Sequence, residues 1–327
     1  MFKYEIKKHK KDGHEYAEIS GFDGKVENLT VPEQIDGYKV EAIGNHAFSG
    51  REDIVSVTIS ESVKTIYGFA FHNCRNLKKI TLFDSLDDYY DGVCRQCDSL
   101  EEVEITINRS WYEVIRNFLA DVDKEMRFLI HVRNDSGENG SVTAETASKS
   151  PLSADKSYSM SCLTFPGYVY DFNENTMART IQFSIAGAGM FYRECVDRRK
   201  IDYRQYDKLF DKAIIDGGKT CHDIAIGRLL YPVELEEIYK NAYETYLNQN
   251  GYNVLERIIN DSETNQDSIT LLEKLLDYKR HDGSSLFSDE AIEKAVQLSS
   301  SKGLTILSAV LMDKSKSSIS DEQFFTL

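Results

Sequence analysis

Three windows of the sequence repeat one another and decide the fold of the first third of the chain. Residues 40–59 read VEAIGNHAFSGREDIVSVTI, residues 63–82 read VKTIYGFAFHNCRNLKKITL, and residues 86–105 read LDDYYDGVCRQCDSLEEVEI. The windows superpose at a spacing of 23 residues. The coinciding apolar positions are Ile54, Leu77 and Leu100, then Val57, Ile80 and Val103, then Ile59, Leu82 and Ile105. Internal repetition at a fixed period of this length is typical of solenoids.

Each window ends in a short alternation of apolar and polar residues, such as Val57-Thr58-Ile59. Such alternation is typical of a strand that buries one face. One copy cannot bury its own apolar side chains, whereas stacked copies enclose a continuous column. The sequence therefore predicts a solenoid in which strands at 57–59, 80–82 and 103–105 are parallel neighbours in one sheet.

The repeated residues also resemble a known family. Ile43-Gly44-x-x-Ala47-Phe48, together with Leu77-x-x-Ile80-Thr81-Leu82 and Val31-Pro32, is similar to the BspA-type leucine-rich repeats. The start of the chain, with a turn at Lys11-Asp12-Gly13, resembles the opening hairpin of that family. The resemblance covers about residues 1–107, and the third copy departs from it at Tyr89 and at Val93-Cys94. It implies a leucine-rich-repeat fold that binds other proteins, a role best known on bacterial surfaces.

The remainder of the chain has no repeat of this kind. Ser110 is predicted to cap a helix from Trp111 to about Asp121, and a strand at 126–132 then closes the array. Residues 134–160 are rich in Ser, Gly, Ala, Glu and Asn, as in a flexible linker. Helical periodicity follows at 202–213, 222–230, 234–247, 252–260, 268–280, 288–299 and 303–313. The predicted fold class is a two-domain α+β protein: a repeat domain at 1–133, the linker, and a mainly helical domain at 161–327, either an irregular bundle or an α-solenoid.

The composition excludes some partners. The 327 residues contain 39 basic and 54 acidic side chains, a formal net charge of −15. Nucleic acid is therefore not an expected partner, because phosphate binding needs clustered Lys and Arg. No apolar run approaches the roughly 20 residues of a membrane span, and the first residues lack signal-peptide features. We expect no membrane insertion and a cytoplasmic location, with the cell surface or secretion as the alternative if a leader has been removed.

Two local motifs, a C-x-x-C at 94–97 and an acidic stretch at 84–91, are found in ligand-binding sites but also have a purely structural interpretation. Cys94-Arg95-Gln96-Cys97 is a C-x-x-C motif, found in zinc and redox sites. Its cysteines align with Phe71 and Cys74 of the preceding copy, which favours buried structural thiols. The acidic stretch 84–91 lacks the spacing of an EF-hand and is predicted to be a solvated loop, with contact to calcium or to a basic partner as the alternative. We expect no cofactor, no metal and no catalytic residue.

The alternation within the strands also predicts a binding face. Because the apolar residues of each strand face the core, the residues between them face outward. The predicted binding face consists of Asn28, Thr30, Ser56, Thr58, Ser60, Lys79, Thr81, Phe83, Glu102, Glu104 and Thr106. Phe83 is either an exposed anchor for the partner or is covered by another part of the chain. The predicted function is non-catalytic binding of a protein partner of unknown identity. The alternative is an enzyme or effector activity in the helical half, with the repeats as a targeting arm.

Overall fold

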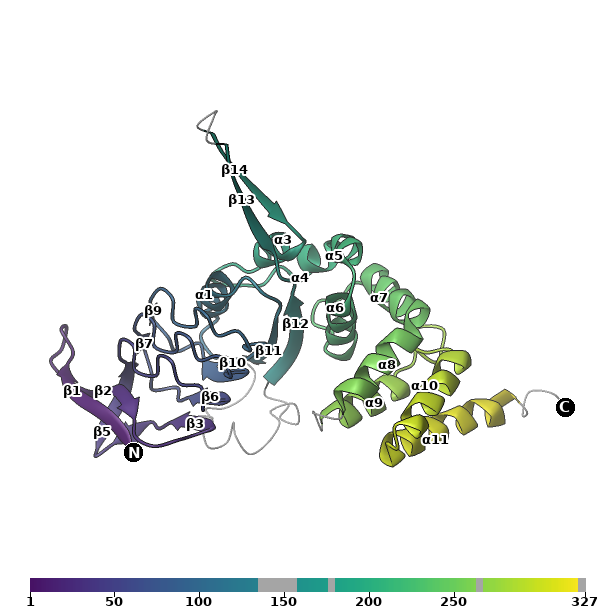
Figure 1. Ribbon diagram of the computed structural model, residues 1–327, viewed down its shortest axis with the longest axis horizontal. Helices are drawn as coiled ribbons and strands as arrows, with labels where there is room; N and C mark the ends of the chain where they lie inside the picture. Colours follow the sequence, from purple (N-terminus) through teal and green to yellow (C-terminus); the bar gives the residue numbers. More distant parts are fainter. Residues whose placement is uncertain (135–157, 176–179, 263–266, 323–327) are drawn as a thin grey trace. The chain divides into compact units, whose positions relative to one another are not determined.

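The computed structural model describes residues 1–134, 158–175, 180–262 and 267–322 (Figure 1). Its contacts divide the chain into two compact units, Met1–Thr220 and Cys221–Leu327. The linker predicted at 134–160 lies almost wholly outside the described residues. The division between units falls about 60 residues after that linker, and one strand that follows the linker, at 158–165, joins the sheet of the repeats.

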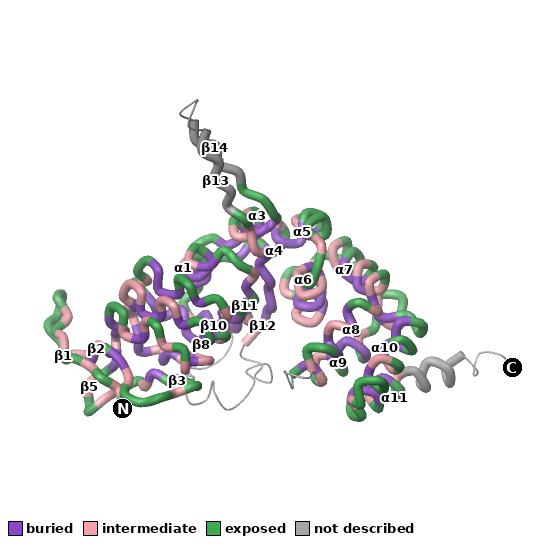
Figure 2. Tube along the Cα trace, viewed as in Figure 1, coloured by how far each residue is buried: buried purple, intermediate pink, exposed green. Residues whose placement is uncertain are grey.

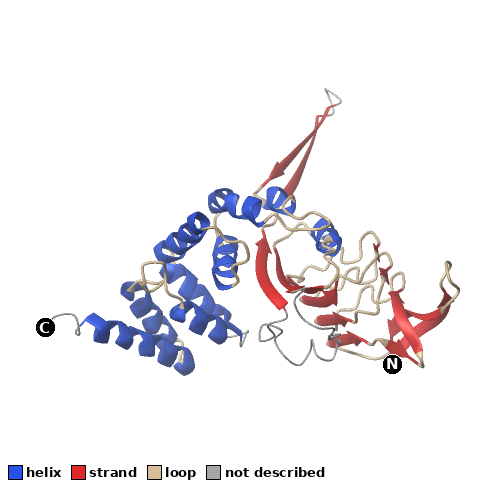
Figure 3. Cartoon of the chain, turned by 180° about the vertical axis from the view of Figure 1, so that it is seen from behind, coloured by secondary structure: helices blue, strands red, loops and turns tan. Residues whose placement is uncertain are grey.

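The first unit contains two main sheets and a hairpin (Figure 3). The strands of the first sheet are β1 (Phe2–Lys8), β2 (Glu15–Phe22), β5 (Tyr38–Ile43), β7 (Thr65–Ile66) and β9 (Asp88–Tyr89), with β4 (Gln34–Ile35) paired to β5. The second sheet has the order β12 (Tyr158–Phe165), β11 (Met126–Arg133), β10 (Glu102–Ile107), β8 (Lys79–Phe83), β6 (Ser56–Ile59) and β3 (Asn28–Val31). Successive coils of the solenoid supply one strand to each sheet.

The predicted repeat is confirmed by strand register. β6, β8 and β10 are parallel, and Val57 pairs with Ile80, which pairs with Val103. All three side chains are buried. The rings of Phe48 and Phe71 stack with centroids 5.3 Å apart. Apolar residues at equivalent positions thus form the continuous column that the 23-residue spacing predicts, and buried residues concentrate inside the coils (Figure 2).

The opening hairpin is formed by β1 and β2, which pair antiparallel. Its turn contains Gly13 with φ of +74°, in the left-handed region that glycine adopts without steric cost. β2 then pairs in parallel with β5, so the hairpin extends the first sheet of the solenoid. The turn predicted at Lys11-Asp12-Gly13 is therefore present.

The end of the array differs in part from the prediction. Helix α1 runs over Glu113–Asp121, and its N-cap residue is Tyr112. Ser110 does not cap it, because its backbone has φ of +54° and the Tyr112 amide, which a cap at Ser110 would bind, donates instead to the Arg198 carbonyl at 2.9 Å. The Trp111 amide donates to the Asp84 carboxylate. The predicted closing strand is confirmed as β11, which is parallel to β10. β12 then pairs antiparallel to β11, where the sequence predicted the start of a helical domain.

The rest of the first unit combines a hairpin and short helices. β13 (Val169–Asn175) and β14 (Thr180–Ala186) form a two-stranded antiparallel sheet. Helices α3 (Gly189–Arg193), α4 (Tyr203–Lys208) and α5 (Phe210–Asp216) follow. The carboxylate of Asp202 accepts a hydrogen bond from the Gln205 amide at 2.8 Å, which confirms the predicted N-cap. The helix predicted at 202–213 is divided at Leu209 into α4 and α5.

The second unit is helical, in agreement with the predicted periodicity. Its helices are α6 (Lys219–Leu230, which begins at the unit boundary), α7 (Glu237–Gln249), α8 (Gly251–Asp261), α9 (Asp267–Asp277), α10 (Asp289–Ser301) and α11 (Thr305–Glu322). Leu255, Leu275 and Ala295 are among its fully buried apolar residues. The carboxylate of Glu244, also buried, accepts a hydrogen bond from the Tyr278 hydroxyl at 2.8 Å. Within the described residues, no helix combines the length and the hydrophobicity that crossing a bilayer would require.

Candidate binding face

Parallel register aligns the outward residues of five strands into two rows. The first row runs Asn28, Ser56, Lys79, Glu102 and Arg127, and the second runs Thr30, Thr58, Thr81, Glu104 and Leu129. Neighbouring strands of a sheet lie about 4.8 Å apart, so each row is a regular ladder of side chains. The two rows cover the second sheet from β3 to β11 (Figure 1).

One half of this face carries hydroxyl and amide groups. Asn28 and Thr30 are exposed, while Ser56, Thr58 and Thr81 are partly exposed. The Ser56 hydroxyl donates to the Asn28 side-chain oxygen at 2.6 Å. The in-register threonines of β3, β6 and β8 present donors and acceptors at a fixed spacing.

The other half carries a chain of alternating charges. The Lys79 ammonium lies 2.9 Å from Glu102 and 2.6 Å from Glu104. Glu102 also accepts a hydrogen bond from the Arg127 guanidinium at 2.9 Å. Glu104 lies 3.0 Å from Nε2 of His131. The charges are therefore held by one another in fixed positions.

Ion pairing shifts the pKa values of two side chains in this half, Glu104 and Lys79. Burial disfavours the charged form of Glu104, but the interactions with His131 and Lys79 outweigh it and lower the pKa of Glu104 to about 2. Burial also disfavours the charged form of Lys79, yet Glu102 and Glu104 raise the pKa of Lys79 above its ordinary value. The two side chains are thus a stable cation and anion near neutral pH.

The prediction that Phe83 is an exposed anchor is wrong. Phe83 is 1% exposed, and its neighbours in register, Thr106 and His131, are 3% and 2% exposed. Ser60 is also buried, at 1%. Burial alternates along β3 and β6, but it stops alternating at the end of β8, and β10 is buried at every position except Glu104. The accessible part of the predicted face is therefore limited to the two rows, with Glu102 itself largely covered by its ion-pair partners.

The sequence analysis missed the contribution of β11. It predicted this strand as a closing cap and did not assign its outward residues to the face. Arg127 and Leu129 continue the two rows, and His131 holds the end of the charge chain. Their alternation with Met126, Phe128 and Ile130 is the signal that would have found them.

The cysteines of the C-x-x-C motif are buried, as the repeat predicted. Cys94, Cys97 and Cys74 are buried free thiols. The thiol of Cys74 donates to the carbonyl of Phe48 at 3.1 Å, and that of Cys97 donates to the carbonyl of Phe71 at 3.1 Å. Equivalent cysteines of adjacent coils thus make equivalent hydrogen bonds.

The acidic stretch 84–91 is only partly a solvated loop. Asp84 is 1% exposed. Its carboxylate accepts hydrogen bonds from the backbone amides of Asn108 at 3.0 Å and Arg109 at 2.7 Å. Asp87 is exposed and pairs with the Arg109 guanidinium at 3.0 Å. Asp84 thus fixes the segment after β10, which the sequence alone did not indicate.

Comparison with known proteins identifies a repeat family for part of the first unit. Residues 22–118 match the family model of the BspA type leucine rich repeat region, in six copies. A leucine rich cell surface protein from Faecalibacterium prausnitzii is 22% identical over 33% of this chain and 37% of its own, with a TM-score of 0.27. A leucine-rich repeat protein from Bacteroides ovatus is 24% identical over 33% of this chain and 30% of its own, with a TM-score of 0.27. No curated protein matches the chain.

The first unit therefore contains a solenoid of leucine-rich repeats. Within it, residues 22–118 are a BspA-type leucine-rich repeat region. The chain spans only about a third of the two solved structures named above. The second unit, residues 221–327, lies outside the matched residues.

Proposed function

We propose that the chain is a non-catalytic interaction protein that binds a protein partner on the two open rows of the second sheet. The observation that supports this most strongly is the register of the rows, which places ten side chains from five strands on one surface. The rows combine hydroxyls, paired charges and the aliphatic Leu129. Interfaces between proteins contain this mixture of polar and apolar groups.

Preorganisation supports the proposal further. The side chains of Lys79 and Glu104 are held by ion pairs before a partner arrives, so less side-chain freedom is lost on binding. The hydroxyl half has no net charge. We therefore infer a partner surface that is polar and carries both a donor-rich segment and a charged pair.

The test uses the intact chain as bait, with capture followed by mass spectrometry. The face variant is Thr81→Arg, which places a bulky cation at the centre of the second row. The matched control is Thr65→Arg, because Thr65 is also partly exposed but belongs to β7 of the other sheet. Thermal melts establish that both variants remain folded.

We expect Thr81→Arg to weaken binding of the captured partner at least about tenfold, a loss of about 1.4 kcal/mol, and Thr65→Arg to leave it unchanged. Equal affinity in all three chains would contradict the proposal and place the binding site elsewhere. Detection of a turnover activity in the intact chain would favour the alternative of an enzyme or effector in the helical half.

A further inference from the structure

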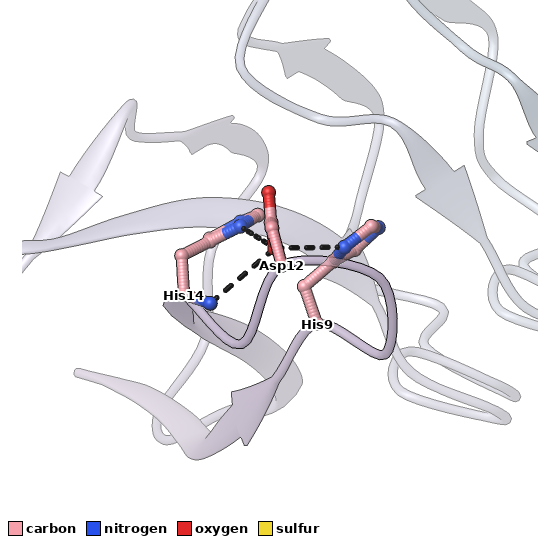
Figure 4. A group of neighbouring side chains, drawn as sticks. All are labelled: His9, Asp12 and His14. Atoms are coloured by element: carbon pink, nitrogen blue, oxygen red, sulfur yellow. Dashed lines mark hydrogen bonds and ion pairs between the residues drawn. The ribbon is translucent and has the colours of Figure 1, made fainter.

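A cluster of two histidines and an aspartate lies at the tip of the β1–β2 hairpin (Figure 4). This hairpin belongs to the first sheet, whereas the binding face lies on the second. The carboxylate oxygen Oδ1 of Asp12 lies 3.1 Å from Nδ1 of His9 and 2.7 Å from Nδ1 of His14. The two imidazole rings stack with centroids 4.9 Å apart. The hairpin turn thus directs three potential metal ligands toward one point.

The distances suit a small transition-metal ion. The three ligand atoms all lie within 4.8 Å of one another. Zinc binds nitrogen at about 2.0–2.1 Å and carboxylate oxygen at about 2.0–2.2 Å in a tetrahedron, so its ligand atoms are roughly 3.4 Å apart. Small side-chain rotations bring the three atoms to that separation. A donor set of imidazole and carboxylate favours zinc over magnesium or calcium, which bind mainly to oxygen ligands.

A second carboxylate orients one of the ligands. Nε2 of His14 lies 2.8 Å from Oε2 of Glu41, a residue of β5 that is 27 positions away in the sequence. When Nε2 carries the proton and donates it to Glu41, Nδ1 of His14 is left with a free lone pair. Metal-ligating histidines commonly donate their other ring N–H to a carboxylate in this way. The position of Glu41 is thus a second observation, independent of the turn, that points to a metal.

We propose that His9, Asp12 and His14 bind a Zn²⁺ ion, with Nδ1, Oδ1 and Nδ1 as ligands and Glu41 as the supporting carboxylate. The ion binds the lone pairs of the two Nδ1 atoms, any proton on these atoms is released to solvent, and a water molecule completes the tetrahedron. Of the nearby lysines, Lys7 and Lys8 are paired with Glu5 and Glu15, at 2.6 and 3.4 Å, whereas Lys10 and Lys11 are exposed in the turn between His9 and Asp12. The three ligands are partly exposed, at 40%, 63% and 41% of their side chains, so the ion is exchangeable.

The experiment titrates zinc sulfate into the metal-free intact chain by calorimetry. The variants Asp12→Asn and His14→Gln each remove one ligand, and Glu41→Gln removes only the supporting charge. The control is His46→Asn, because His46 is exposed and has φ of +54°, a conformation that asparagine tolerates. Cobalt chloride serves as a second probe, since tetrahedral Co²⁺ has a characteristic visible absorption.

We expect one saturable zinc site in the intact chain. Asp12→Asn and His14→Gln abolish it, Glu41→Gln weakens it about tenfold, and His46→Asn leaves it unchanged. Absence of saturable binding to the intact chain would overturn the proposal. So would zinc affinity that is the same in the Asp12→Asn and His14→Gln variants as in the intact chain, or that falls equally in the His46→Asn control.

Discussion

The repeat region and the helical unit bury their polar groups in different ways. In residues 22–118, adjacent coils repeat one environment, as the equivalent hydrogen bonds of the Cys74 and Cys97 thiols show. In residues 221–327, a buried contact such as that between Glu244 and Tyr278 joins two particular helical segments. An environment that recurs in successive coils produces a residue pattern with a fixed period in the sequence. A contact that occurs once produces no such pattern and cannot be predicted in this way.

The largest expected effect tests the recurring core. Phe71 is fully buried and stacks on Phe48 of the adjacent coil. Truncation by Phe71→Ala leaves a cavity and is expected to lower the free energy of unfolding by about 3–5 kcal/mol. Chemical denaturation measures the loss, with the exposed Arg75→Ala as control. An unchanged midpoint would show that the coils do not share one core.

Glu104 provides a pH-dependent test of the charge chain on the repeat. Its folded pKa, about 2, lies below the ordinary value of 4.5, so ionised Glu104 stabilises the fold above about pH 4.5. This contribution is lost as the pH falls through 2. Glu104→Gln is therefore expected to cost about 2 kcal/mol at pH 7 and nearly nothing at pH 2.

Denaturation of both chains across this pH range measures the difference. Lys79→Met is the companion variant, because it removes one of the two charged partners and leaves the interaction with His131. A difference between the chains that stays constant from pH 7 to pH 2 would contradict the assigned role of Glu104.

The helical unit is tested by removing one non-recurring contact. Tyr278→Phe deletes the hydroxyl that donates to buried Glu244, and a hydrogen bond to a charged group contributes about 1.5 kcal/mol or more. Tyr252→Phe is the matched control, since its hydroxyl donates to Glu256 at 3.1 Å near the surface. Calorimetry of the intact chain should show a lower transition temperature only for Tyr278→Phe. An equal decrease in transition temperature in both variants would contradict the prediction that the buried contact to Glu244 stabilises the unit more than the contact near the surface.

The smallest expected effect concerns the C-x-x-C motif. Cys94 is 1% exposed, so Cys94→Ser buries a hydroxyl in its place and is expected to cost about 1 kcal/mol. Metal analysis of the purified chain should show the same zinc content in the variant and in the original. A loss of zinc in Cys94→Ser would reverse the structural interpretation of the motif.

The predictability of each feature follows from its physical origin. The coils, the closing strand and the helices of the second unit were predictable, because periodic burial of apolar residues produces them. The absence of a cap at Ser110 was not predictable, because the local backbone depends on tertiary contacts. Ser110 has φ of +54°, and the next amide, that of Trp111, donates a hydrogen bond to the Asp84 carboxylate. The burial of Phe83 depends on tertiary packing that alternation within one strand does not express.

The binding face and the proposed zinc site also differ in how far the sequence predicts them. Eight of the ten row positions lie in the repeated strands and follow from one register. The cluster requires a turn that brings His9 and Asp12 together and a distant strand that brings Glu41 to His14. His9, Asp12 and His14 are close together in the sequence, but Glu41 is 27 positions from His14, and no sequence pattern indicates that these two residues meet.

The antiparallel strand β12 limits how the array can grow. A further coil would have to add a parallel strand beside β11, and that edge is already occupied by a strand of the opposite direction. A further 23-residue unit therefore cannot be added beside β11, whereas insertion between β6 and β8, where both neighbours are parallel, preserves the direction of every strand. β12 thus ends the run of parallel strands on this side of the sheet, so on this side the length of the array can change only by insertion between existing coils.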